Sequence, residues 1–149
     1  MKKITALVSV ALMLVMLLCA VNVSAAAKSF PDVKKSAWYY DAVMKASELG
    51  VVGGMPDGTF APKSSLTRAQ YIIILQRISG AENDASSSFT DVASTAWYAG
   101  AVGWAVKAGI VGGYDDNTFR GNNPISRQEL MVMTSRYLSY AWLDIPADP

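Results

Sequence analysis

The residues with the clearest chemical potential are two arginines, Arg68 and Arg127, which lie 59 positions apart in matching sequence contexts. Each is expected at the first position of a helix, where free backbone N–H groups and a guanidinium can together bind an anion. The alternative for either residue is a surface arginine that pairs with a nearby carboxylate. The recurrence of the same pattern keeps both interpretations open.

Two capping boxes predict where these helices begin. Thr67 and Gln70 form the first box, and Ser126 and Glu129 form the second. In such a box the hydroxyl accepts the backbone N–H of the third helical residue, while the Gln or Glu side chain accepts the N–H of the cap residue itself. Losing such a cap typically costs about 0.5–2 kcal/mol.

Both helix starts belong to a unit of sequence that occurs twice. From Phe30 onward the chain matches itself at an offset of 59 residues without gaps. The spacing of apolar residues predicts a first helix over 37–49 in one unit and over 96–108 in the other. Second helices are predicted over 68–79 and 127–139, and because they are apolar over much of their surface, we expect both to be central and mostly buried.

A glycine-rich loop joins the two helices of each unit. Pro-Asp-Gly in loop 53–60 is typical of a turn, and Asp-Asn in loop 112–119 tolerates the same backbone conformation. Phe60 and Phe119, at the loop ends, are expected to pack back onto the helices. These features predict an all-α fold of tandem helix–loop–helix units. The expected organisation is a first unit at 28–80, a linker at 81–88 and a second unit at 89–140.

The N-terminus has the pattern of a secretory signal peptide over residues 1–27. A basic start and an apolar run too short for a comfortable membrane span precede small residues suited to cleavage; a retained membrane anchor is the alternative. Cleavage removes Lys2, Lys3 and Cys19 and leaves 11 basic and 12 acidic residues, no cysteine and no histidine. Such a composition excludes disulfides, thiolate or imidazole metal sites and Ser-His-Asp or Cys-His catalysis. It gives no reason to expect a metal, a cofactor, a nucleic acid or a membrane span.

Two units of this size bury little apolar surface. Arrays of this kind usually need about three units to complete their core, and a third would place its first Phe at about position 148. We therefore expect one of two situations. Either the chain is a truncated product of a three-unit domain, with 141–149 as the connector toward the missing unit, or it completes itself with another copy.

The duplicated motif resembles the surface-layer homology (SLH) domain, over residues 30 to about 140. The resemblance rests on F-x-D-V at 30–33 and 89–92, A-W-Y at 37–39 and 96–98, the Gly-rich loops, and (T/S)-R-x-(Q/E) at 67–70 and 126–129. It implies non-covalent anchoring of a secreted protein to the bacterial cell wall, without catalysis. It also implies a pseudo-threefold spindle of three units around a central helix bundle. The grooves between units would bind pyruvylated secondary cell-wall polysaccharide or a peptidoglycan-linked polymer.

Carried over position by position, the resemblance assigns polysaccharide binding to one set of residues in each unit. The sets are Arg68, Asp32, Trp38, Gly54 and Asp57, and Arg127, Asp91, Trp97, Gly113 and Asp116. Arginine would pair with the pyruvate carboxylate, tryptophan would offer a flat face to a sugar ring, aspartate would accept from sugar hydroxyls, and glycine would admit the backbone close to the ligand. The alternatives are core packing for the tryptophans and helix capping for Asp32 and Asp91.

Two other functions fit the sequence. One is an oligomerising structural module of the cell envelope, in which the chain pairs with another copy or with another SLH unit. The other is a glycosidase, whose two carboxylates would have to come from residues such as Asp32, Glu82, Asp91 or Glu129.

Overall fold

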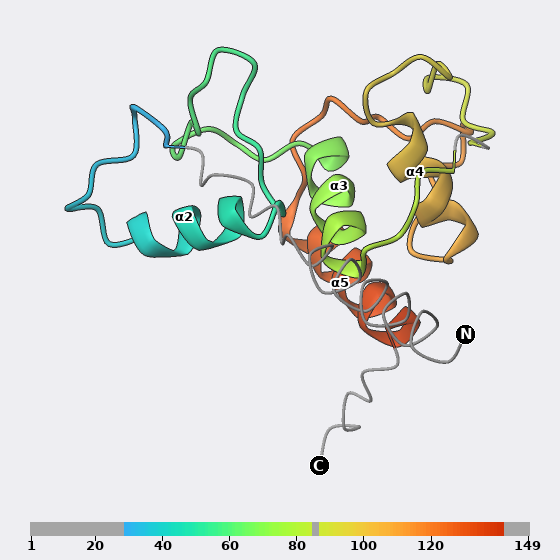
Figure 1. Cartoon of the computed structure of the whole chain (residues 1–149). Helices are drawn as coiled ribbons and strands as arrows, with labels where there is room; N and C mark the ends of the chain where they lie inside the picture. Colours follow the sequence, from blue (N-terminus) through green and yellow to red (C-terminus); the bar gives the residue numbers. More distant parts are fainter. Residues whose placement is uncertain (1–28, 85–86, 142–149) are drawn as a thin grey trace, which may run out of the picture.

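The computed structural model describes residues 29–84 and 87–141, so the predicted signal peptide and all but the first residue of the predicted connector lie outside the described residues. This part contains four α-helices and no strand beyond one isolated bridge between Thr67 and Pro124, which confirms the all-α prediction. The helices are α2 (Tyr40–Glu48), α3 (Arg68–Ser79), α4 (Ala99–Lys107) and α5 (Arg127–Tyr140) (Figure 1). None of these helices is long and apolar enough to cross a membrane.

The first helix of each unit is shorter than the sequence predicts. Both α2 and α4 begin three residues after the predicted start, because the preceding residues form tight turns instead. The backbone N–H of Tyr40 donates to Ala37 O at 2.9 Å, and that of Ala99 donates to Ala96 O at the same distance. Gly50, at φ 71°, ends the first helix in the left-handed conformation, as its position in the sequence predicts.

The second helices begin where the sequence predicts, and both capping boxes are present. In α3, Thr67 Oγ1 accepts from the Gln70 N–H, and the Gln70 side chain accepts from the Thr67 N–H. In α5, Ser126 and Glu129 make the same reciprocal pair. The start of each second helix is therefore fixed by hydrogen bonds between residues three positions apart.

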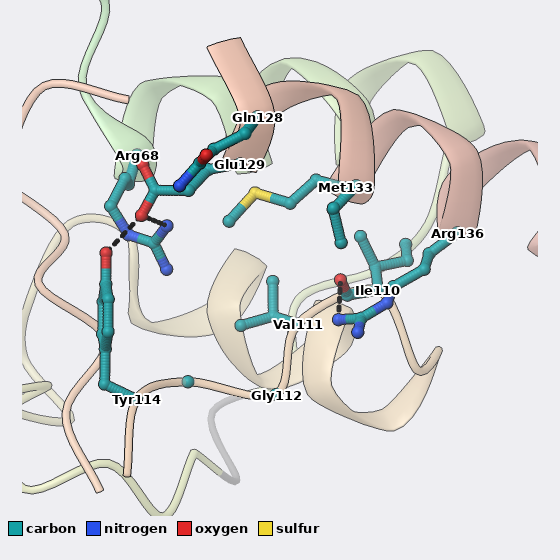
Figure 2. A pocket seen from close by; sticks show the side chains of 11 residues that line it. Arg68, Ile110, Val111, Gly112, Tyr114, Gln128, Glu129, Met133 and Arg136 are labelled. Carbon is teal, nitrogen blue, oxygen red and sulfur yellow. Dashed lines mark hydrogen bonds and ion pairs between the residues drawn. The ribbon is translucent and has the colours of Figure 1, made fainter. Parts of the chain in front are cut away.

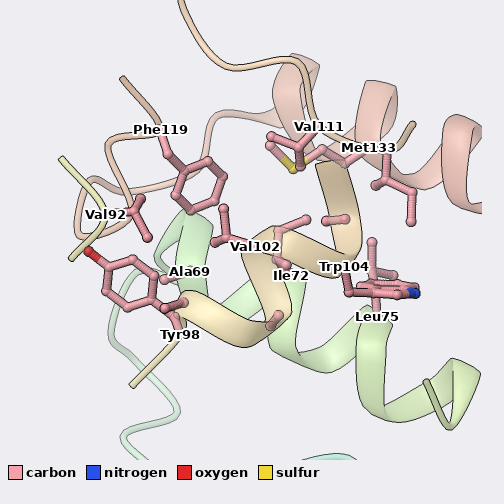
Figure 3. Close-up of a cluster of buried hydrophobic side chains, with 14 of the residues drawn as sticks. Ala69, Ile72, Leu75, Val92, Tyr98, Val102, Trp104, Val111, Phe119 and Met133 are labelled. Carbon is pink, nitrogen blue, oxygen red and sulfur yellow. The ribbon is translucent and has the colours of Figure 1, made fainter. Parts of the chain in front are cut away.

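The main core lies where α3 of the first unit packs against α4 of the second. This is the most extensive contact between helices in the described part of the chain. Ile72 of α3, Val102 of α4 and Phe119 of the second loop are fully buried there, and Figure 3 shows Ile72 and Leu75 near Val102 and Trp104. The principal core is therefore shared between the two units.

The outer helices are much less covered. The prediction that the second helix of each unit is mostly buried is correct for α3 but wrong for α5, where Met131 is 61% exposed and Val132 is 48% exposed. At the other end, α2 lies apart from the other helices (Figure 1) and packs in a small cluster with Phe30 and Phe60. Within the described residues, each unit is therefore covered by a neighbouring unit on one side only.

Each loop is pressed against the phenylalanine that opens its unit. Gly113 has φ 75°, and a Cβ placed on it would come within 2.2 Å of Phe89 Cε1. Gly54 repeats the arrangement, with φ 72° and a Cβ position 2.4 Å from Phe30 Cε1. Glycine is required at both positions by the backbone conformation and by the ring that lies over it.

We expect Gly113→Ala to lower the free energy of unfolding by about 1–3 kcal/mol, because the methyl group adds left-handed strain to a clash with Phe89. Gly112→Ala is the matched control, since a Cβ there meets nothing within 4 Å, and its effect should stay within about 0.5 kcal/mol. Denaturant unfolding of the two variants measures the difference. Equal effects would contradict the steric explanation.

Candidate functional site

A groove of about 450 Å³ lies at the junction of the two units. The start of α3 forms one wall, and the second loop and α5 form the rest (Figure 2). The lining residues are Arg68, Ile110, Val111, Gly112, Gly113, Tyr114, Gln128, Glu129, Val132, Met133 and Arg136. The first unit contributes one side chain to this lining, that of Arg68.

Arg68 is nearly buried and is held by the other unit. Its side chain is 4% exposed. Nε donates to Phe119 O at 2.9 Å, and Nη1 donates to Glu129 Oε1 at 2.9 Å. The guanidinium also lies over the Tyr114 and Phe119 rings, 4.8 and 5.0 Å from their centroids, which adds cation–π attraction. Nη2 makes no hydrogen bond in the described residues.

Backbone contacts fix the direction of this arginine. The first two N–H groups of α3, at Arg68 and Ala69, donate to Asn123 O at 3.0 Å and Gly121 O at 2.9 Å. The Ile125 N–H donates in return to Leu66 O at 3.0 Å. Because the first N–H groups of a helix have no partner within the helix, the loop of the second unit satisfies donors that would otherwise need water.

Glu129 is strongly acidic in this setting. The Tyr114 hydroxyl donates to Oε1 of Glu129 and is the largest cause of a pKa near 2, well below the usual 4.5. The Ser126 N–H and hydroxyl and the Arg68 charge act in the same direction, while burial opposes them. The same hydrogen bond raises the pKa of Tyr114. Glu129 is therefore a carboxylate, and Tyr114 a neutral phenol, across the physiological pH range.

Arg136 supplies a second cation to the groove. Its Nη1 donates to Ile110 O at 3.4 Å, and it forms no salt bridge with any carboxylate of residues 29–84 or 87–141. Figure 2 shows Arg136 at the opposite end of the lining from Arg68, with Met133 and Val111 between them. With two guanidinium groups and one carboxylate, the groove has a net positive charge.

The backbone of the second loop adds neutral donors. Gly112 and Gly113 are exposed and line the groove. Within the described part of the chain, their N–H groups have no hydrogen-bond acceptor. Free N–H groups beside two guanidinium groups suit an oxyanion.

The aspartates that the resemblance assigns to ligand binding organise the loops. Asp32 accepts the N–H groups of Phe60 and Ala61, 2.9 and 2.7 Å away, and the Phe60 bond is the largest cause of its lowered pKa. Asp91 likewise accepts from Phe119 and Arg120, each at 2.7 Å. These bonds span 28 and 29 residues, so they differ from the local helix caps that were the alternative.

Asp57 and Asp116 close the turns of the two loops. Asp57 Oδ1 accepts from the Thr59 hydroxyl at 2.7 Å, and this bond is the largest cause of its lowered pKa. Asp116 does the same with Thr118 at 2.6 Å and also pairs with Arg120 at 3.0 Å. Neither aspartate lines the groove.

The two tryptophans are on the surface, which excludes their alternative role as core residues. Trp38 is 94% exposed and Trp97 is 65% exposed. Each meets the following tyrosine edge to face, at ring centroid distances of 5.5 and 5.3 Å. Neither lines the groove at the junction.

Of the residues that the resemblance assigns to binding, the structure places only Arg68 and Gly113 in the groove, together with the predicted cap Glu129. Arg127 is exposed and lies outside the groove lining. The sequence assignments also grouped Arg68 with loop residues of its own unit, such as Asp57 and Gly54, whereas its side chain contacts the second unit.

Sequence reasoning missed Tyr114, Gln128 and Arg136 as groove residues. Arg136 carried a usable signal, because it recurs at the repeat spacing as Arg77. Tyr114 carried none, because Met55 occupies its position in the first unit.

We expect Glu129→Gln to weaken the acid sensitivity of the fold. The folded pKa of Glu129 is depressed, so its contribution to stability is complete above about pH 4.5 and is lost as the pH falls toward 2. The wild type should therefore lose more thermal stability across this interval than the variant, as scanning calorimetry at several pH values would measure. Gln70 fills the same capping position in α3, so the cap should survive. Tyr114→Phe should act in the same direction, and parallel pH profiles for all three proteins would refute this account.

Comparison with known proteins gives a family for the chain. The S-layer homology domain model matches residues 29–72 and 88–131, one match in each unit. The chain is 33% identical over 112 residues to a surface layer protein of Brevibacillus choshinensis, covering 72% of this chain and 10% of that protein. It is 32% identical over 116 residues to a cellulosome-anchoring protein of Acetivibrio thermocellus, covering 74% and 26%. It is 38% identical over 103 residues to endo-1,4-beta-xylanase A of Thermoanaerobacterium saccharolyticum, covering 68% and 9%.

The chain thus spans about a quarter or less of the length of these relatives. The family and the surface-layer relatives indicate a secreted protein of the bacterial cell surface, associated with the wall. The duplication, the matched capping boxes and the family model all agree on the same two segments. The chain therefore belongs to the S-layer homology domain family and carries two tandem copies of that domain.

Proposed function

We propose that the groove between the two units anchors the protein by binding an acidic wall polysaccharide, and that the acid is a ketal-linked pyruvate. Anchoring at the cell surface follows from the family. The assignment of pyruvate as the bound acid is supported by the groove, because its net positive charge and its free N–H donors suit a carboxylate carried on a neutral sugar chain.

The observation that carries this proposal is the unpaired charge of Arg136. Glu129 already compensates Arg68 at 2.9 Å, whereas Arg136 has only a carbonyl partner in the part of the chain described. A ligand carboxylate could therefore pair with Arg136 without displacing an internal ion pair. The neighbouring N–H groups of Gly112 and Gly113 offer further hydrogen bonds, and Val111 and Met133 offer an apolar floor.

The same geometry argues against glycoside hydrolysis in this groove. Glycosidases need two carboxyl groups, one of them protonated near neutral pH. Glu129 is the one carboxylate in the lining, and its pKa near 2 keeps it ionised. The enzyme-named relative does not change this view, since the chain matches 9% of its length.

Binding roles for residues outside the groove remain proposals. The exposed faces of Trp38 and Trp97 could stack on sugar rings further along the polymer. Arg127 is exposed at the start of α5 and could meet a second acidic sugar.

Arg136→Gln should weaken binding to pyruvylated wall polymer by about 10- to 100-fold, because it removes a charge-assisted hydrogen bond. Calorimetric titration of the secreted chain with the purified polymer measures this change. Arg77→Gln is a matched control: Arg77 makes the same bond, to Val51 O at 3.3 Å, but lies outside the groove. Its affinity should stay close to wild type.

The polymer provides a second control. Removing the pyruvate ketal by mild acid should weaken wild-type binding to the level of Arg136→Gln and should leave that variant unchanged. Binding that ignores both changes would refute pyruvate recognition by this groove.

A further inference from the structure

The first turn of α3 is covered by the second unit, whereas the first turn of α5 is open. Their sequences match at the repeat spacing. In α3, the Arg68 and Ala69 N–H groups donate to Asn123 O and Gly121 O. The counterpart donors, the N–H groups of Arg127 and Gln128, have no acceptor within residues 29–84 and 87–141.

The surface that would cover this turn is present on the first unit. Ser64 and Pro62 occupy the positions of Asn123 and Gly121, and their carbonyls accept no hydrogen bond in the described residues. The third hydrogen bond of the junction runs from the Ile125 N–H to Leu66 O. Its counterpart would run from the Leu66 N–H to Ile125 O, and neither group makes a hydrogen bond in the described residues. The donors and acceptors for three hydrogen bonds, equivalent to the three at the junction between the units, are thus unused and have the same spacing along the chain.

The covering loop of the first unit already has the required shape. Ala61 and its counterpart Arg120 share an unusual left-handed backbone, with φ 56° and 57°. The Ser64 N–H donates to Ala61 O at 3.0 Å, and the equivalent bond in the second loop, from Asn123, has the same length. Docking onto this loop would therefore need little ordering of the backbone.

The helix faces show the same pattern of missing cover. Ile72 of α3 is fully buried against the second unit, while its counterpart Met131 on α5 is 61% exposed. Ala101 of α4 is buried, while its counterpart Ala42 on α2 is exposed. Among the described residues, α5 and α2 (Figure 1) therefore carry the two halves of a contact like that between α3 and α4, and both halves are uncovered.

We propose that a second copy of this chain covers α5. In this contact the first-unit loop and α2 of the second copy would pack on α5, as the second-unit loop and α4 pack on α3 within one chain. Because the two surfaces differ, the contact is head to tail, and it closes a ring or extends a row of copies. Lys45 of α2 stands where α4 has Trp104. The helix contact consequently buries less apolar surface than α3–α4, and association depends on concentration.

This contact would give the Arg127 guanidinium the carbonyl partner that Arg68 has, but not its carboxylate partner. Its Nε would reach Phe60 O of the second copy, the counterpart of Phe119 O. The new groove would place Met55 and Gln70 where the existing groove has Tyr114 and Glu129. It would thus contain Arg127 and Arg77 without that carboxylate. The association does not rest on the proposed function.

Sedimentation velocity of the secreted chain, without polymer, tests the association between about 1 µM and 1 mM. We expect the wild type to shift to larger species as its concentration rises. Met131→Glu should block the α5 face and Ala42→Glu the α2 face, and both residues are exposed, so each variant should fold and remain monomeric. An equimolar mixture should form a heterodimer, because one intact face of each kind remains.

Ser139→Glu is the control, since Ser139 and its counterpart Gly80 are both exposed, and it should associate like the wild type. Three results would overturn the proposal: a wild type that stays monomeric at every concentration, variants that associate normally, or a mixture that remains monomeric. Because no polymer is present, none of these results bears on pyruvate recognition, and loss of polymer binding in Arg136→Gln would not bear on association.

Discussion

The insertion of Arg68 into the second unit is the interaction on which the described structure most depends. One side chain binds the Phe119 carbonyl, the Glu129 carboxylate and the face of Tyr114, while the backbone beside it donates to the same loop. An arginine buried to this degree is tolerated only when its charge and most of its donors are satisfied. The contact therefore fixes both the distance and the orientation between the two units.

Sharing of the core follows from the size of the units. The first helices have nine residues each, and such a helix cannot bury a complete apolar face against its own short loop. The solution is to pack α4 on the α3 that precedes it, so that Ile72 and Val102 are fully buried together. The arrangement resembles other repeat proteins, whose stability comes from the interfaces between units. Its consequence is that the outermost units remain partly uncovered.

The groove reuses parts that the fold already needs. Glu129 caps α5 and pairs with Arg68, and Gly113 is a glycine because Phe89 lies against it. Loss of one of these residues would disturb the structure and the proposed binding together. Arg136 is different, because it makes a single long hydrogen bond to a carbonyl in the described residues and keeps its charge free. The groove thus separates the residues that hold its shape from Arg136, the residue that we propose recognises the ligand.

The sequence by itself determined the features that depend on near neighbours. Capping boxes fixed the starts of α3 and α5, and glycine fixed the end of α2, because their hydrogen bonds and dihedral angles involve residues a few positions apart. The duplication and the all-α class followed from the same local patterns. The tight turns before Tyr40 were missed, because helical periodicity continues through them.

Only the tertiary structure decided which unit each side chain contacts. Arg68 and Arg127 have similar local sequences, yet one is buried and the other exposed, because a following unit covers the first turn of α3 and none of the described residues covers the first turn of α5. Tyr114 entered the groove without any signal from the repeat. The physical reason is that burial and ion pairing at a junction depend on residues about 50 to 60 positions away, which a local pattern does not encode.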